Sequence, residues 1–197
     1  SHSTTPPESH STTPPQSSST TPLQSYSTTT DYKNENLPGK PSMSLLTGVV
    51  YDPSRDELFY ACRESGAFLN HKKITVSKAS SLRESILGTG FYYSRGKELD
   101  ITLKTIRSFF TNGIIGIRRM GSAALDLCYV ACGRLDGFLE QYLSPWGFSA
   151  GILIVEEAGG KATDLTGRHI PLAPSYIVSS NSAIHREMLL IVNESSI

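Results

Sequence analysis

The first 32 residues set the tightest limit on what this chain can fold into. They form four eight-residue repeats, SHSTTPPE, SHSTTPPQ, SSSTTPLQ and SYSTTTDY, built mainly from Ser, Thr and Pro. A segment with so few aliphatic side chains cannot bury enough apolar surface to offset an ordering entropy of about 1–2 kcal/mol per residue. We therefore expect residues 1–42 to form a disordered arm and linker, and residues 43–197 to form the folded region.

The pattern of the folded region predicts an α/β fold. Short strand-like runs separated by turns fill residues 46–76, which is typical of a β-meander. From residue 86 onward strands alternate with helices. In proteins with this order the helices pack over the faces of a sheet. The expected strands are 47–51, 57–63, 67–69, 74–76, 86–90, 114–117, 136–141, 161–164 and 176–180, and the expected helices are about 99–110, 122–131, 148–158 and 183–192.

The helices carry start, stop and burial signals. Ser122 is expected to cap the second helix and Gly133 to end it, while Pro145 precedes the third. The third helix is apolar on all sides and is therefore expected to lie between two layers. In the first helix, Leu99, Leu103, Ile106 and Phe110 recur at helical spacing, which predicts that they share one face.

Charge and hydropathy exclude several classes of partner. The chain has 18 basic and 18 acidic residues, so nothing favours diffuse electrostatic binding to nucleic acid or to acidic membranes. No apolar run reaches the roughly 18 residues that a membrane span needs. Three cysteines without zinc-ligand spacing, and no apolar export segment, favour a cytoplasmic location.

The stretch PWGFSAG contains Gly147-x-Ser149-x-Gly151, the pattern of a serine hydrolase nucleophile elbow. An elbow needs a buried strand immediately before the turn. Here Pro145 stands two residues before the pattern and removes a strand hydrogen bond. A serine hydrolase acting through Ser149 is therefore an alternative that the local sequence disfavours.

A set of spaced motifs gives a second interpretation of the same stretch. The motifs are Gly48 to Pro53, Glu57-Leu58-Phe59, Gly66 to Asn70, Thr89-Gly90-Phe91, Gly121-Ser122-Ala123-Ala124, Ala131 to Gly137 with Glu140, Pro145-Trp146 with Ala150-Gly151, and Glu156 to Gly160. Together they resemble the inositol monophosphatase family. The likeness runs from about Gly48 to the end of the chain.

The resemblance implies a fold, an activity and a site. Members are layered α/β sandwiches, usually dimeric, that hydrolyse inositol or sugar phosphates with Mg²⁺. Gly121, Ser122 and Ala123 would bind substrate through their backbone at a helix start, and Glu140 would accept hydrogen bonds from substrate hydroxyls. Asp126 in the same helix is expected to be a surface or capping charge, and Trp146 to pack in the core or a cavity wall.

Two departures from the family pattern predict impaired catalysis. The residue after Trp146 is normally a metal-binding aspartate, and here it is Gly147. The family's other metal-binding carboxylates lie in an N-terminal half, in G-E-E/S and D-P-[IL]-D-G-T-x-N-F elements that do not occur in this sequence. The resemblance therefore implies a layered sandwich that is truncated at its N-terminus. We assign no catalytic or metal-binding residue in this chain.

Two functions are compatible with these motifs. The first is an enzyme that works weakly, or through a partner that brings the missing carboxylates, on a small phosphorylated polyol or sugar. The second is a non-catalytic module that binds a polyol phosphate, forms a homodimer or pairs with an intact paralogue. The loss of the aspartate at Gly147 favours the second, because Mg²⁺ needs hard carboxylate oxygens.

Overall fold

A computed structural model describes residues 44–93 and 95–196 of the chain, apart from the side chain of residue 196. The predicted arm and linker, residues 1–42, lie outside these residues, so their disorder stays a prediction. The strands are β1 (Thr47–Asp52), β2 (Glu57–Cys62), β3 (Gly66–Leu69), β4 (Lys72–Ile74), β5 (Ile86–Thr89), β6 (Gly116–Arg118), β7 (Gly137–Leu143), β8 (Lys161–Thr163) and β9 (Ser175–Ser180). The helices are α1 (Lys97–Thr111), α2 (Ala123–Ala131), α3 (Pro145–Glu157) and α4 (His185–Ser196), with a 3₁₀ turn at Leu82–Glu84.

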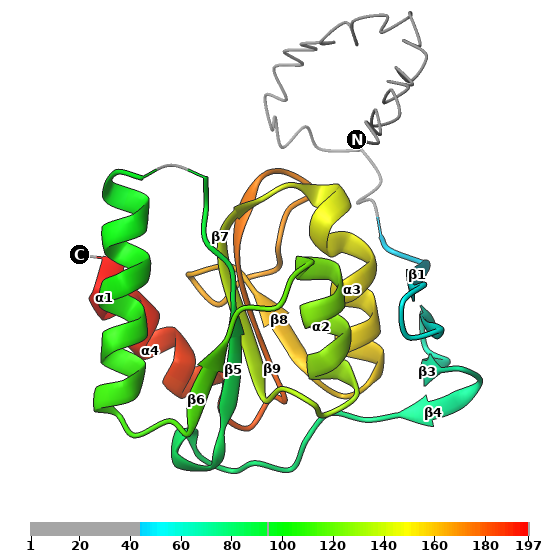
Figure 1. The fold of residues 1–197 in the computed structure, drawn as a ribbon. Helices are drawn as coiled ribbons and strands as arrows, with labels where there is room; N and C mark the ends of the chain where they lie inside the picture. Colours follow the sequence, from blue (N-terminus) through cyan, green and yellow to red (C-terminus); the bar gives the residue numbers. More distant parts are fainter. Residues whose placement is uncertain (1–43, 94, 197) are drawn as a thin grey trace, which may run out of the picture. The chain divides into compact units, whose positions relative to one another are not determined.

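The elements form layers, as Figure 1 shows. Four antiparallel strands in the order β1-β2-β3-β4 make one sheet, and five strands in the order β6-β5-β7-β9-β8 make a mixed sheet. Helices α2 and α3 lie between the two sheets, and α1 and α4 cover the other face of the mixed sheet (Figure 1). The predicted layered α/β sandwich is confirmed.

The four-stranded sheet alternates as a half-buried meander should. Phe59, Ala61 and Ala67 point toward α2 and α3 and are fully buried. Val49 and Tyr51, on the opposite face of β1, are 56% and 52% exposed. The predicted β-meander is therefore confirmed, and one face of its sheet lies in the core.

The predicted end of α2 and the predicted start of α3 are confirmed, whereas the Ser122 side chain makes no capping hydrogen bond at the start of α2. Ser122 precedes α2, and Gly133 follows it with φ of +75°, a left-handed conformation that glycine adopts without strain. Pro145 is the first residue of α3. Both helices are buried on nearly all sides because they lie between two sheets, as the third helix was expected to do.

The predicted apolar face of α1 is wrong. Leu103 and Phe110 are about half exposed, while Thr102, Thr105 and Phe109 are buried. Thr102 and Thr105 donate their hydroxyls to the carbonyls of Glu98 and Ile101, at 2.9 and 2.8 Å. Since these bonds satisfy the hydroxyls, the threonines can occupy the buried face.

Within the described residues, no helix combines the length and the apolar character that crossing a membrane requires.

Strand β1 of the four-stranded sheet packs tightly against α3 at Gly48. A Cβ atom at this position would lie 2.8 Å from the Ala150 carbonyl oxygen and 3.1 Å from its Cα. Gly48→Ala is therefore expected to push β1 away from α3 and lower the free energy of unfolding by about 1–3 kcal/mol. Urea denaturation measures the change.

Gly147→Ala is the matched control, because the added Cβ would meet no atom closer than Leu143 Cδ2 at 4.0 Å. Alanine is also the better helix former. The packing account of Gly48 is refuted if the two variants lose the same stability.

Candidate functional site

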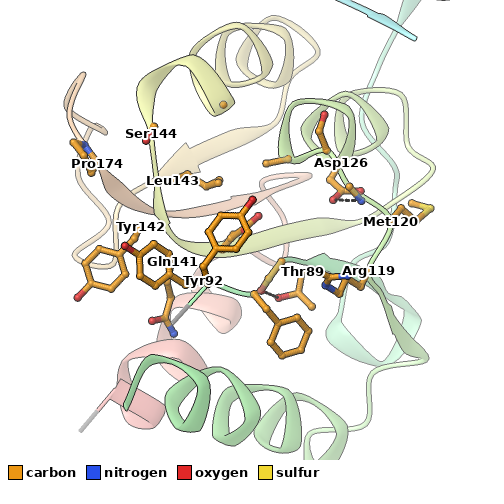
Figure 2. Close-up of a pocket in the computed structure, with 18 of the residues that line it drawn as sticks. Thr89, Tyr92, Arg119, Met120, Asp126, Gln141, Tyr142, Leu143, Ser144 and Pro174 are labelled. Atoms are coloured by element: carbon orange, nitrogen blue, oxygen red, sulfur yellow. Dashed lines mark hydrogen bonds between the residues drawn. The ribbon is translucent and has the colours of Figure 1, made fainter. Parts of the chain in front are cut away.

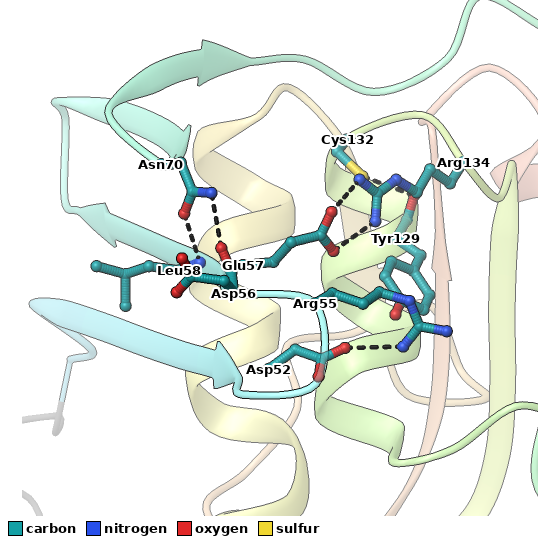
Figure 3. Close-up of polar contacts among 9 residues, drawn as sticks. All are labelled: Asp52, Arg55, Asp56, Glu57, Leu58, Asn70, Tyr129, Cys132 and Arg134. Carbon is teal, nitrogen blue, oxygen red and sulfur yellow. Dashed lines mark hydrogen bonds and ion pairs between the residues drawn. The ribbon is translucent and has the colours of Figure 1, made fainter.

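A cavity of about 590 Å³ opens at the edge of the mixed sheet where β5 and β7 end. Most of its wall comes from four segments: residues 89–93 at the end of β5, 119–123 at the start of α2, 140–143 at the end of β7, and 144–147 at the start of α3. Asp126 and Pro174 complete the wall. Figure 2 shows these side chains around the opening. Parallel strands β5 and β7 end at the same edge, where α/β sheets commonly bind ligands.

The sequence-predicted site residues meet at this cavity. Gly121, Ser122, Ala123, Glu140 and Gly147 all line it, although they come from two helix starts and one strand. The structure therefore brings them together in space. Their binding roles stay predictions.

The start of α2 presents backbone donors to the cavity. Gly121 has φ of +71°, and its N–H donates to Asp126 Oδ2 at 3.2 Å. The Ser122 side chain makes no capping hydrogen bond, so it does not occupy the first-turn N–H groups of α2. Such an uncapped helix start is a favourable place for an anion.

Glu140 stands on β7 with its carboxyl group beside Gly90. A Cβ atom at Gly90 would overlap that carboxyl group, so the glycine makes room for it. Burial, with the nearby charge of Asp126, raises the pKa of Glu140 to about 7, and Arg119 partly opposes this shift. Near neutral pH the group can therefore donate or accept a hydrogen bond.

Asp126 is the site residue that sequence reasoning missed. It is 2% exposed rather than on the surface, and burial raises its pKa to about 6. Its Oδ1 is buried and accepts no hydrogen bond within the part of the chain that the structure describes. The signal that could have found it is its position as the one charged side chain of the helix AALDLCYVA.

Aromatic side chains form the rim of the cavity. The rings of Tyr92 and Tyr142 lie 5.1 Å apart, and the Arg119 guanidinium lies 5.6 Å from the Phe91 ring centre. Trp146 lines the cavity, as one of its two expected places required, but it is 88% exposed and therefore does not lie in the core. It is the first residue after the proline that begins α3, and nothing in the described chain covers it there.

The donor set does not fit Mg²⁺. Mg²⁺ needs several hard oxygen ligands in octahedral geometry. The cavity offers the carboxylates of Asp126 and Glu140, both with raised pKa, and Gly147 adds no side chain. Among the described residues, no three His, Cys, Asp or Glu side chains come close enough together to hold a metal ion.

Ser149 does not stand on a strand-to-helix turn. It lies inside α3, and its hydroxyl donates to the Pro145 carbonyl at 2.6 Å. The ring nitrogens of the buried His185 lie 2.9 Å from the hydroxyls of Thr163 and Ser180, so this imidazole is not available as a base for Ser149. The geometry gives the serine-hydrolase alternative no support.

Comparisons with known proteins agree with the motifs. The sequence model of the inositol monophosphatase family matches residues 42–196. An inositol-1-monophosphatase of Synechocystis is 46% identical over 141 residues, which are 72% of this chain and 49% of the relative. The Nus factor SuhB of Escherichia coli is 47% identical over 141 residues, 72% of this chain and 52% of the relative.

A comparison with solved structures leads to the same family. The inositol monophosphatase of Anabaena superposes with a TM-score of 0.71 at 40% identity, covering 76% of this chain and 59% of that protein. The chain spans about half the length of the curated relatives it matches.

The raised pKa of Glu140 predicts a pH effect on stability. The folded protein favours the neutral carboxyl, so its stabilising contribution is complete below the ordinary pKa of 4.5 and is lost as pH rises through about 7. Glu140→Gln removes this loss. We therefore expect the free energy of unfolding of Glu140→Gln, minus that of the unmodified protein, to be larger at pH 8 than at pH 5. Urea denaturation at the two pH values measures this difference.

Glu194→Gln on the exposed surface of α4 is the control and should show no such pH-dependent difference. The buried environment of Glu140 is refuted if both variants show the same difference at the two pH values.

Proposed function

Because this chain belongs to the inositol monophosphatase family, we propose that its cavity binds a phosphorylated polyol or sugar and that the chain alone hydrolyses it weakly or not at all. The observation that carries the proposal is the convergence of two helix starts, Arg119 and two carboxyl groups on one cavity. The proposal has two parts, binding and turnover, with separate supports.

Binding is supported by the charge distribution around the opening. The first turns of α2 and α3 both adjoin it, and neither Ser122 nor Ser144 caps its helix with a side-chain hydrogen bond. The two helix dipoles and Arg119 therefore favour an anion such as a phosphate group. Glu140 lies within the same wall, where a polyol hydroxyl could reach it.

The two carboxyl groups limit how strongly an anion binds. Asp126 and Glu140 repel phosphate when ionised, but burial raises the pKa of each to about 6 and about 7. Binding is thus expected to strengthen as pH falls toward 6. This electrostatic balance favours a neutral polyol ring carrying one phosphate over a ligand with several.

Weak turnover is supported by the donor set. Hydrolysis of a phosphate monoester has a very high uncatalysed barrier, which metal enzymes lower by generating hydroxide and by neutralising the entering and leaving oxygens. The described residues bring two carboxyl groups to the cavity, those of Asp126 and Glu140, and position 147 is glycine. We therefore derive no metal-dependent step for this chain by itself.

A second candidate is an enzyme completed by a partner that brings the missing carboxylates. The unpartnered Oδ1 of Asp126 favours it, because a buried carboxylate oxygen without a donor is costly unless something else satisfies it. Mg²⁺-dependent release of phosphate from inositol monophosphate, in the presence of such a partner, would distinguish it from a binding module.

Arg119→Met tests the binding part. Removing the guanidinium is expected to weaken the binding of myo-inositol monophosphate about tenfold, about 1.4 kcal/mol, as measured by calorimetry. Arg118→Met is the matched control, since the Arg118 guanidinium donates to the Ile117 carbonyl at 3.1 Å and Arg118 lines a different hollow. Absence of binding by the unmodified chain, or equal effects of both variants, would contradict the proposal.

Gly147→Asp tests the turnover part. The position has room for a side chain, so the added carboxylate is expected to raise Mg²⁺ affinity at least tenfold, as measured by calorimetry. Gly147→Asn is the neutral control and should change the affinity little. Phosphate release by the unmodified chain is expected to stay at background, and brisk Mg²⁺-dependent release would refute the loss of catalysis.

A further inference from the structure

Tyr142 on β7 has a backbone conformation that is unusual for its residue type. Its φ is +53°, in the left-handed region that favours glycine. The other described non-glycine residues with positive φ lie in turns or bends, whereas Tyr142 lies within a strand. A bulky side chain strains the backbone in this conformation, and strained residues are concentrated at functional sites.

A β-bulge accompanies this conformation. Between Glu140 and Leu143 the register of β7 against β9 shifts, because β7 holds one more residue than β9 there. Bulges change the direction in which a side chain points, and they are frequent beside active sites. Here the bulge lies in the wall of the cavity, which Glu140 and Tyr142 both line.

Contacts on both sides hold the bulge in place. On one side, Gln141 is buried, and its Nε2 donates to the Thr102 hydroxyl in α1 at 3.1 Å. On the other side, Ser144 stands at the start of the buried helix α3. A strained conformation persists where its surroundings determine it in this way.

Packing in the core does not explain the strain at Tyr142. The residue is 53% exposed, so its ring adds little to the buried apolar surface. The ring lies at the opening of the cavity, with its centre 5.1 Å from that of Tyr92 (Figure 2). The strained backbone therefore places an aromatic ring at the opening rather than in the core.

The distance between the two rings limits how a ligand can meet them. A flat group inserted between two rings needs them about 7 Å apart, twice the contact distance of carbon atoms. The rings of Tyr92 and Tyr142 are 5.1 Å apart and inclined at 47°, so they contact each other. A ligand in the cavity would therefore pack against the outer surface of the pair.

Glu140 and the tyrosine pair together suit a ring that carries hydroxyls. A cyclic polyol has hydroxyl groups around its edge and C–H groups on its faces. Its edge can exchange hydrogen bonds with Glu140, while one of its faces packs against an aromatic ring. An acyclic polyol phosphate of the same charge has hydroxyls for Glu140 but no ring face for Tyr142.

We propose that Tyr142, in contact with Tyr92, selects cyclic over acyclic polyol phosphates. The ring of the ligand packs against Tyr142, its hydroxyls reach Glu140, and its phosphate group lies at the start of α2. Tyr142 is then a specificity-determining residue, and the bulge is the feature that directs its ring to the cavity. The inference rests on the proposed function, since it names the class of ligand that the same cavity takes.

Calorimetry with two esters of equal charge, myo-inositol monophosphate and glycerol 2-phosphate, tests the selection. The unmodified chain is expected to bind the inositol ester about tenfold more tightly. Tyr142→Gly and Tyr142→Ala both remove the ring, so each is expected to weaken the inositol ester alone and to lower the preference to about twofold. Tyr142→Phe keeps the ring and should keep the preference.

Tyr51→Ala is the matched control, because Tyr51 is 52% exposed on β1 and lies outside the cavity wall. It should leave the preference unchanged. Urea denaturation tests the strain separately. Tyr142→Gly is expected to unfold at a higher urea concentration than Tyr142→Ala, since only alanine keeps a Cβ atom in the left-handed conformation. A lower midpoint for Tyr142→Gly would show that the backbone is not strained.

Three results would overturn the selection by Tyr142. They are equal binding of the two esters by the unmodified chain, an equal weakening of both esters in Tyr142→Gly, and loss of the preference in Tyr142→Phe. Equal binding of the two esters would leave the proposed function standing, because that function requires only that a phosphorylated polyol binds. Absence of binding by either ester would remove both.

Discussion

The close packing of α2 and α3 between two sheets determines the rest of this structure. A Cβ atom at Gly151 would lie 2.7 Å from Leu127, and one at Gly48 would lie 2.8 Å from the Ala150 carbonyl oxygen. Glycine at these positions lets α3 approach α2 on one side and β1 on another. Because both helices are held this closely, their first turns are fixed beside the ends of β5 and β7, and the cavity forms there.

The same packing sets the electrostatics of the cavity. Two helix starts and Arg119 favour negative charge, while burial of Asp126 and Glu140 disfavours their ionised forms. This balance of charges is the basis for the proposed binding of a ligand with one anionic group and several hydroxyls. It does not suit a divalent cation, since the position that would add a third carboxylate is glycine. The proposed weak turnover rests on this donor set.

An uncovered surface follows from the layered arrangement. Helices cover both faces of the mixed sheet, but the meander has them on one face, so Tyr51, Tyr60 and the edge of β1 lie at a boundary of the described fold.

The sequence by itself determined the order and type of the strands and helices, the family, and the five positions that meet at the cavity, because local periodicity, glycine and proline signals and spaced motifs are properties of neighbouring residues. It failed where burial depends on what packs from outside. Thr102 and Thr105 lie on the face of α1 that is buried, which their hydroxyl hydrogen bonds within the helix permit. Asp126 is buried because α2 lies between two sheets, and Trp146 is exposed because no described segment covers it. Only the tertiary structure decided these points, since a helix pattern shows which residues share a face but not which face has a neighbour.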